Sequence, residues 1–278
     1  MKVRLEEAAK VLVCRSCGNN SLTLNLGFIS CPKCLVRYRY LNEKVFIDEP
    51  QVVEVETFPN SLKGRTVDKN ILRAESRKYL KKVLSALEFE LVLDVGTGRG
   101  HFLSEFELDK KVLTLDHMAY EDVIVVANIE KGLPISENSF DVVILSHTLE
   151  HIFDTEALLS DCFRILKPGG FLVGVVPFLT KVHQAPYDFH RLTDFALRRY
   201  FKDIGFTCIE VLPLTSVVET ISLHINSSYK FLSKELNVFE RGVIKLLIKS
   251  WQLISQNLKR GEVRSDFTLG YGFNCKKL

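Results

Sequence analysis

The sequence lacks any apolar run long enough to cross a bilayer, which requires about 20 residues. Its most apolar stretches, residues 91–95 and 171–176, are far shorter. The opening residues Met1-Lys2-Val3-Arg4 carry no apolar segment of the kind found in secretory signals. We therefore expect a soluble cytoplasmic protein without a transmembrane segment.

A strong net charge is also missing, because 37 basic residues nearly balance 34 acidic ones and leave a formal net charge of +3. The basic excess lies at the two ends, whereas residues 91–226 are acidic. This distribution argues against a uniform nucleic-acid-binding face, which is usually strongly basic. With 46% hydrophobic and 26% charged residues, the composition excludes disordered and collagen-like chains. The length of 278 residues accommodates one large domain and a small module.

The cysteines are seven in number, and an odd count fits poorly with a secreted disulfide framework. Four of them form two Cys-x-x-Cys pairs, Cys14 with Cys17 and Cys31 with Cys34. Two such pairs can complete a closed tetrahedral zinc site. A redox dithiol is the alternative, but it is expected beside a βαβ pattern. We predict a zinc ribbon over residues 1–50 whose structural metal stabilises the module, with recognition of a substrate or partner as the alternative role.

The rest of the chain shows an alternating pattern. Residues 51–67 have little periodicity and are predicted to form a linker, after which Asp68 is expected to cap a helix. Short apolar runs then alternate with helical segments, which is typical of a parallel sheet covered on both faces. The predicted strands are 91–95, 111–115, 123–127, 140–145, 170–176, 207–214 and 266–276. The predicted helices are 101–107, 155–166, 195–204 and a long helical stretch over 217–260.

A glycine-rich segment follows the strand at 91–95 and is predicted to lead into a helix. Its backbone amides would face the crevice at the carboxyl edge of the sheet, where open α/β sheets bind ligands. The spacing of the glycines at 96, 98 and 100 departs from the dinucleotide-binding fingerprint. Asp94 would repel a pyrophosphate but suits a cation, and Asp116 at the end of the next strand can accept hydrogen bonds from ribose hydroxyls. These residues predict a ribonucleoside ligand that carries positive charge.

The ordered series of motifs resembles class I S-adenosylmethionine-dependent methyltransferases, in particular the group called methyltransferase type 11. The resemblance covers about residues 68–215 and the last strand, and it implies a methyltransferase domain over 68–278 with a helical insertion at 217–260. It also implies an α/β, Rossmann-like fold with a seven-stranded sheet. The motifs are Asp94–Gly100, Asp116, Asn128-Ile129, Asn138–Asp141, Ser146–His151 and Leu166–Gly170. The segment Ile29–Cys34, with Tyr38 and Phe46–Asp48, is similar to Trm112-type zinc ribbons.

The resemblance implies S-adenosylmethionine as the cofactor and gives its contacts. The glycines lie against the methionine part, Asp116 holds the ribose, and Asn128 with Ile129 contacts the adenine. The family commonly has Asp in place of Asn128, but an amide oxygen can still accept from the adenine amine. The implied cofactor-binding residues are Asp94, Gly96, Thr97, Gly98, Gly100, Asp116, Asn128, Ile129, Ser146 and His147.

The segment after the fifth strand, residues 177–193, concentrates ionisable side chains on the ligand-binding edge. It is similar to a segment of methyltransferases associated with surface-polysaccharide and glycolipid loci. A hydroxyl acceptor needs a base, and we predict His183 or His190 in that role, with Asp188 orienting it. The alternative is that Asp188 and Arg191 pair to hold the loop.

Two further patterns have structural interpretations. His147 and His151 are four residues apart, but no H-E-x-x-H motif accompanies them, so we do not assign them a metal. Within 217–260, an apolar stripe is predicted to pack over the sheet edge or to form a dimer face, with contact to a membrane surface as the minor alternative. The stripe consists of Val243, Leu247, Trp251 and Ile254.

Three functions compete. The leading one is methyl transfer to an oxygen of a sugar-containing or small-molecule acceptor, which includes glycans. The second is methylation of RNA, with the zinc ribbon used for recognition. The third is a non-catalytic regulator that joins a zinc ribbon to a cofactor-binding domain, which the intact glycine segment and Asp116 disfavour.

Overall fold

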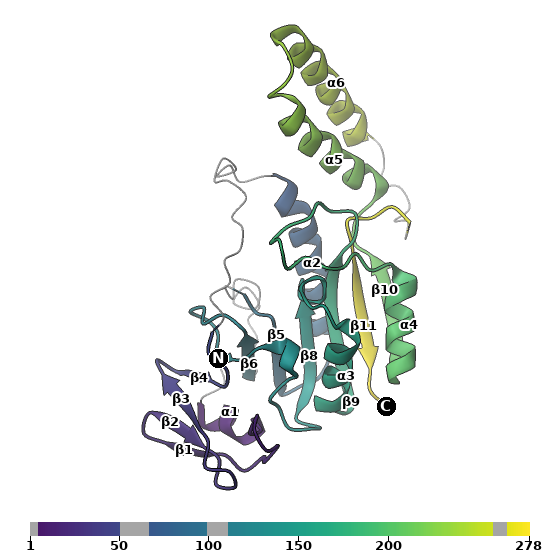
Figure 1. Cartoon of the computed structure of the whole chain (residues 1–278). Coiled ribbons are helices and arrows are strands. Elements are labelled where there is room, and N and C mark those ends of the chain that lie inside the picture. Colours follow the sequence, from purple (N-terminus) through teal and green to yellow (C-terminus); the bar gives the residue numbers. More distant parts are fainter. Residues whose placement is uncertain (1–4, 51–66, 99–110, 258–265) are drawn as a thin grey trace.

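The computed structural model describes residues 5–50, 67–98, 111–257 and 266–278 (Figure 1). Seven strands of its sheet follow the order β7-β6-β5-β8-β9-β11-β10. The first five are parallel, and β11 runs antiparallel to both of its neighbours, β9 and β10. This arrangement confirms the predicted Rossmann-like sheet. The strands are β5 (Leu91–Val95), β6 (Lys111–Asp116), β7 (Val125–Val126), β8 (Phe140–Ser146), β9 (Leu166–Pro177), β10 (Thr207–Pro213) and β11 (Gly270–Lys276).

Helices cover the two faces of the sheet because successive strand residues point to opposite sides. On one face, α2 (Val67–Ser85) packs Leu80 and its apolar neighbours against alternate strand residues such as Val92. On the other face, α3 (Thr155–Ile165) and α4 (Asp194–Ile204) pack against the intervening residues such as Leu93. The near-continuous apolar strands seen in the sequence reflect this burial on both sides.

The N-terminal ribbon extends the same sheet, so that eleven strands of the described residues run in one order. It contains α1 (Leu5–Val11), β1 (Thr23–Asn25), β2 (Phe28–Ser30), β3 (Arg37–Leu41) and β4 (Lys44–Phe46). Strand β4 pairs in parallel with β7, where Val45 N donates to Ile124 O at 2.8 Å and Ile47 N donates to Val126 O at 2.9 Å. The ribbon is therefore continuous with the central sheet, a connection that the sequence did not predict.

Arg15, inside the first cysteine pair, ties the ribbon to the loop after β7. Its guanidinium donates to the carbonyl oxygens of Lys131 at 2.7 Å and of Gly132, and to the carboxylate of Asp48 at 2.9 Å. The same Asp48 carboxylate accepts from Asn128 N at 3.0 Å. One cation thus satisfies the carbonyls at the end of the short helix η3 (Ile129–Lys131).

Removing this guanidinium should destabilise the fold. We expect Arg15→Ala to lower the free energy of unfolding by about 1–3 kcal/mol, because it removes the cation paired with the largely buried Asp48 and the donor to the Lys131 and Gly132 carbonyls. Chemical denaturation measures the change. Arg199→Ala, which removes an exposed ion pair with Asp203, is the control and should change stability by less than about 0.5 kcal/mol. Equal effects of the two substitutions would contradict the role given to Arg15.

Several local predictions need correction. Helix α2 begins at Val67, so Asp68 lies inside it instead of capping it. The strand expected over 123–127 is reduced to the two residues of β7, and the last strand begins at Gly270. The helix expected at 101–107 and most of the linker at 51–67 lie outside the described residues.

The stretch 217–260 forms a helical hairpin of α5 (Val217–Leu232) and α6 (Val238–Asn257), which projects from the sheet at the top of Figure 1. Trp251 Nε1 donates to Ser222 Oγ at 2.8 Å and joins the two helices. The prediction that the stripe packs over the sheet edge is wrong, because Leu247 is 63% exposed and Ile254 is 56% exposed. Helix α5 contacts α2. No helix among the described residues is long and apolar enough to span a membrane.

Candidate functional site

The glycine segment bends sharply at the carboxyl end of β5. Gly96 has φ +75° and Gly98 has φ +60°, the left-handed region that favours glycine. A Cβ added at Gly96 would lie 2.6 Å from both the Cγ2 and the Oγ1 of Thr148, whereas no atom of the described residues lies within 4 Å of one added at Gly98. The first glycine is needed for packing, and the second leaves open space beside the backbone. Gly100 lies outside the described residues.

Asp116, at the end of β6, holds the glycine segment in place. Its Oδ2 accepts from Gly98 N at 2.8 Å and its Oδ1 accepts from Met118 N at 2.9 Å. Each carboxylate oxygen has a second lone pair, so the side chain can still accept from a ribose hydroxyl. The structure therefore gives this acid a positioning role in addition to the role that the sequence predicts.

Asp94 lies below the glycines and is 3% exposed. Burial, with a smaller contribution from the negative charge of Asp116, raises its pKa to about 7, although the hydrogen bond with Thr97 acts in the opposite direction. Thr97 Oγ1 also donates to the backbone oxygen of Asp94 at 3.0 Å. Two acidic side chains beneath an open glycine segment favour a ligand with positive charge, as the sequence predicts.

The raised pKa of Asp94 predicts a pH-dependent stability. Between about pH 4 and 7 the folded chain keeps a proton that the unfolded chain has lost, so its contribution to stability declines as the pH rises through this window. Asp94→Asn cannot ionise at this position. We therefore expect its free energy of unfolding, relative to that of the wild type, to be higher at pH 8 than at pH 5 by on the order of a few kcal/mol. Denaturation of both cofactor-free proteins at the two pH values measures this gain. A constant difference would mean that Asp94 titrates normally.

Asn128 and Ile129, the predicted adenine contacts, lie at the start of η3. Asn128 Oδ1 accepts from Glu130 N at 3.0 Å and so caps this helix, which leaves one lone pair on the amide oxygen. Ile129 is buried, at 5% exposure. Their role toward adenine stays a prediction.

Ser146 ends β8, and His147 follows it in the left-handed conformation, with φ +57°. His147 Nε2 lies 3.1 Å from Ser76 Oγ on α2. The next residue, Thr148, donates its hydroxyl hydrogen to Val95 O at 2.9 Å. The chain after β8 therefore runs directly beside the glycine segment.

In the loop after β9, Asp188 contacts both Arg191 and His183, the two partners between which the sequence did not decide. Arg191 donates to both oxygens of Asp188, at 2.6 and 2.7 Å, and His183 Nδ1 lies 3.2 Å from Asp188 Oδ2. The same carboxylate thus holds the loop and orients His183. His190 is placed differently, because its Nε2 lies 3.0 Å from the Phe153 carbonyl oxygen.

Glu150 is a residue to which the sequence analysis gave no role. It lies on the short helix η4 (Leu149–His151), and its side chain is 1% exposed. Three imidazole nitrogens approach its Oε1: His147 Nδ1 at 3.7 Å, His151 Nε2 at 3.8 Å and His183 Nε2 at 3.8 Å. Burial alone would raise the pKa of Glu150, but His147 and His151 outweigh burial and lower it. In the sequence, the position of this carboxylate between His147 and His151 could have indicated that it has a role.

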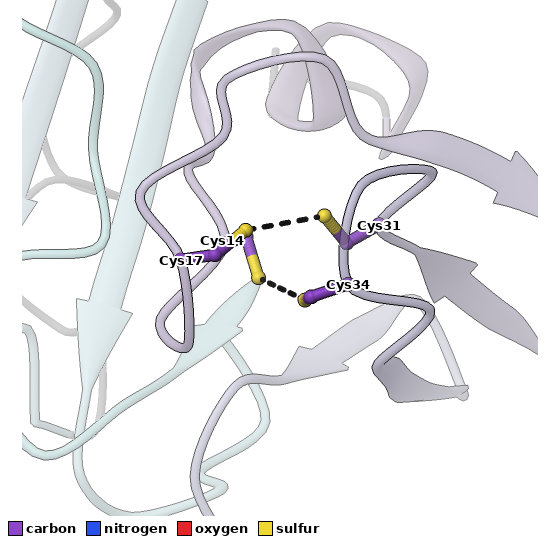
Figure 2. A group of neighbouring side chains, drawn as sticks. All are labelled: Cys14, Cys17, Cys31 and Cys34. Atoms are coloured by element: carbon purple, nitrogen blue, oxygen red, sulfur yellow. Dashed lines mark hydrogen bonds between the residues drawn. The ribbon is translucent and has the colours of Figure 1, made fainter.

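The four cysteines of the ribbon converge on one point, as Figure 2 shows. All are free thiols, with Cys14 Sγ 3.5 Å from Cys34 Sγ and Cys17 Sγ 3.6 Å from Cys31 Sγ. Four sulfurs at about 2.3 Å from one zinc ion lie about 3.8 Å apart, so the arrangement fits the metal. Burial opposes ionisation of Cys31, but the backbone N–H groups of Cys34 and Lys33 outweigh it and lower its pKa to about 6. These residues can hold a structural zinc ion.

Comparisons with known proteins agree with this geometry. A family model described as a methyltransferase domain matches residues 93–174 and confirms the resemblance there. The ubiquinone/menaquinone biosynthesis C-methyltransferase UbiE of Klebsiella pneumoniae is 27% identical over 37% of this chain and 51% of its own length. The mitochondrial ubiquinone biosynthesis O-methyltransferase of Mus musculus is 27% identical over 45% of this chain and 36% of its own length. The chain therefore spans about half or less of these two relatives.

A solved structure with a similar chain path is the 1,6-didemethyltoxoflavin-N1-methyltransferase of Burkholderia thailandensis, which contains bound S-adenosylhomocysteine. It is 15% identical, with a TM-score of 0.48, and the match covers 74% of this chain and 79% of that one.

Proposed function

We propose that this chain, whose residues 93–174 belong to the methyltransferase domain family, is an S-adenosylmethionine-dependent methyltransferase that acts on an oxygen of a sugar-containing or small-molecule acceptor. The observation that carries the proposal is the glycine segment held by Asp116 above the buried Asp94. Open space at Gly98 and a carboxylate at the end of the second strand suit a nucleoside, while two acids suit a sulfonium and not a phosphate.

The residues of the chain divide between cofactor and acceptor. Gly96, Thr97 and Gly98 bind the methionine part, Asp116 accepts from the ribose, and Asn128 with Ile129 borders the adenine. When bound, S-adenosylmethionine supplies a methyl group on a positively charged sulfur, which remains as the neutral thioether after transfer.

On the acceptor side, His183 supports transfer to oxygen. A hydroxyl has a pKa far above neutral, so it must lose its proton to a base within hydrogen-bond reach. Asp188 lies 3.2 Å from Nδ1 of His183, and the other ring nitrogen, Nε2, lies 3.8 Å from Glu150 Oε1. His190, turned toward the Phe153 carbonyl oxygen, is the second candidate.

Binding of S-adenosylhomocysteine tests the cofactor assignment, and calorimetry on the full chain measures it. We expect saturable binding to one site and no binding of NADH. Tight NADH binding without any for S-adenosylhomocysteine would overturn the proposal. RNA affinity that falls steeply with salt would favour the RNA acceptor instead.

Turnover with an oxygen acceptor tests the role of His183. We expect His183→Ala to lower kcat by about 10²–10⁴-fold while leaving the affinity for S-adenosylhomocysteine nearly unchanged, since the substitution lies outside the cofactor contacts. Asp188→Ala should lower the melting temperature as well, because it also releases Arg191. If His190→Ala gives the larger loss of kcat, the assignment passes to His190.

A further inference from the structure

A buried cluster of acceptor atoms lies beside the cofactor site. One ligand atom from each of Glu150, His151 and His183 lies within 4.8 Å of the others. Both carboxylate oxygens of Glu150, and Nε2 of His151, are buried without a hydrogen-bond partner in the described part of the chain. Buried polar atoms are rarely left unpaired, because their desolvation is costly. The cluster therefore needs a missing partner.

Hydrogen-bond accounting shows what kind of partner is missing. His151 Nδ1 contacts the Tyr187 carbonyl oxygen, which can only accept, so this nitrogen carries the hydrogen of a neutral ring. His183 Nδ1 lies 3.2 Å from Asp188 Oδ2 and 3.4 Å from the Arg191 guanidinium. In the neutral ring of His151 the lone pair then sits on Nε2, and the Nε2 atoms of His151 and His183 each lie 3.8 Å from Glu150 Oε1. Among the described residues, the lone pair of His151 and both carboxylate oxygens of Glu150 have no hydrogen-bond partner, and a cation satisfies them.

We propose that Glu150, His151 and His183 bind a divalent first-row transition-metal ion through the carboxylate and the two Nε2 atoms. Ligands about 2.1 Å from one ion lie roughly 3–3.5 Å apart, so a small side-chain movement closes the present 3.8 Å separations. Two histidines and one carboxylate on one side of an ion leave other positions open. The hydrogen bond of His151 with the Tyr187 carbonyl oxygen and the 3.2 Å contact of His183 with Asp188 are of the kind that orients metal-bound histidines.

The position of the cluster indicates what the ion would bind. Glu150 lies two residues after Thr148, whose side chain packs against Gly96 and whose hydroxyl donates to Val95 O. His183 is 31% exposed, so the cluster is open on one side. If the proposed function holds, the acceptor is a hydroxyl compound that chelates the ion through two neighbouring oxygens. In this arrangement His183 holds the ion and does not itself take the proton. A hydroxyl bound to the ion releases its proton to solvent more readily, and its oxygen then attacks the methyl carbon as the carbon–sulfur bond of the cofactor breaks.

Binding of Mn²⁺ alone tests the site, because this ion prefers nitrogen and oxygen ligands over the thiolates of the ribbon. Electron paramagnetic resonance of free Mn²⁺ counts the bound ions on the full, zinc-loaded chain. We expect one ion per wild-type chain and at least a 10-fold weaker affinity in both Glu150→Gln and His183→Ala. His224→Ala, an exposed histidine on α5, is the matched control and should bind Mn²⁺ like the wild type.

Calorimetry with S-adenosylhomocysteine on the same samples separates the two proposals. A variant that still binds S-adenosylhomocysteine is folded, so its weaker binding of Mn²⁺ results from the loss of the substituted ligand. The metal site is overturned if the wild type binds neither Mn²⁺ nor Co²⁺ at millimolar concentration beyond its cysteine site, or if both variants bind as tightly as the wild type. Failure of the wild type to bind S-adenosylhomocysteine overturns the proposed function and leaves the Mn²⁺ result standing.

Discussion

Gly96→Val should weaken binding of S-adenosylhomocysteine by at least about 100-fold. The new Cβ would lie 2.6 Å from the Thr148 side chain, which is buried and bonded to Val95 O, so Thr148 cannot move aside without losing that bond. The valine must also adopt φ +75°, which β-branched residues rarely do. Both effects displace the backbone that borders the cofactor. Isothermal titration calorimetry measures the affinity.

A matched control separates the clash from the backbone penalty. Gly169, near the start of β9, has φ +83°, and a Cβ there meets no atom of the described residues within 4 Å. Gly169→Val should therefore lower stability while leaving the affinity for S-adenosylhomocysteine within about 2-fold. Asp116→Ala should weaken binding about as much as Gly96→Val, because it frees Gly98 and removes the ribose acceptor. Wild-type affinity in Gly96→Val would refute the assignment of this segment to the cofactor.

Loss of the zinc site should have the largest effect on stability. Structural zinc contributes on the order of 10 kcal/mol to small ribbons, which unfold without it. We expect Cys14→Ser combined with Cys31→Ser to abolish zinc binding and unfold the ribbon. The loss should also reach the central domain, because β4 pairs with β7 and Arg15 holds the loop after β7. Metal analysis measures the loss of zinc, hydrogen exchange measures the unfolding of the ribbon, and calorimetry measures the effect on the central domain.

We expect the affinity for S-adenosylhomocysteine to fall about 10-fold or more in the zinc-free variant, although the substituted cysteines are not among the residues assigned to the cofactor. Cys208→Ser is the control, since Cys208 lies in β10 far along the sheet from the ribbon and should leave zinc content at one per chain. If the variant retains full zinc, the cysteine assignment is wrong. If it loses zinc but keeps its affinity, the ribbon and the cofactor site are independent despite their shared sheet.

The sequence by itself determined the features that depend on local spacing. Alternating strand and helix patterns gave the Rossmann-like sheet, because burial on both faces requires apolar strands such as 91–95. Two Cys-x-x-Cys pairs gave the ribbon, because this spacing directs both sulfurs to one point. The glycine segment with Asp94 and Asp116 predicted a nucleoside site, since the ends of adjacent parallel strands meet at one edge.

Only the tertiary structure decided the features that depend on distant segments. Pairing of β4 with β7 joins residues far apart in the chain, and backbone hydrogen bonds leave no side-chain pattern that would reveal it. The approach of His183 to Glu150 and His151 has the same origin, because loops after two neighbouring strands meet above the sheet. The stripe on α6 satisfied the helical period but remained exposed, because periodicity specifies an apolar face and not what covers it.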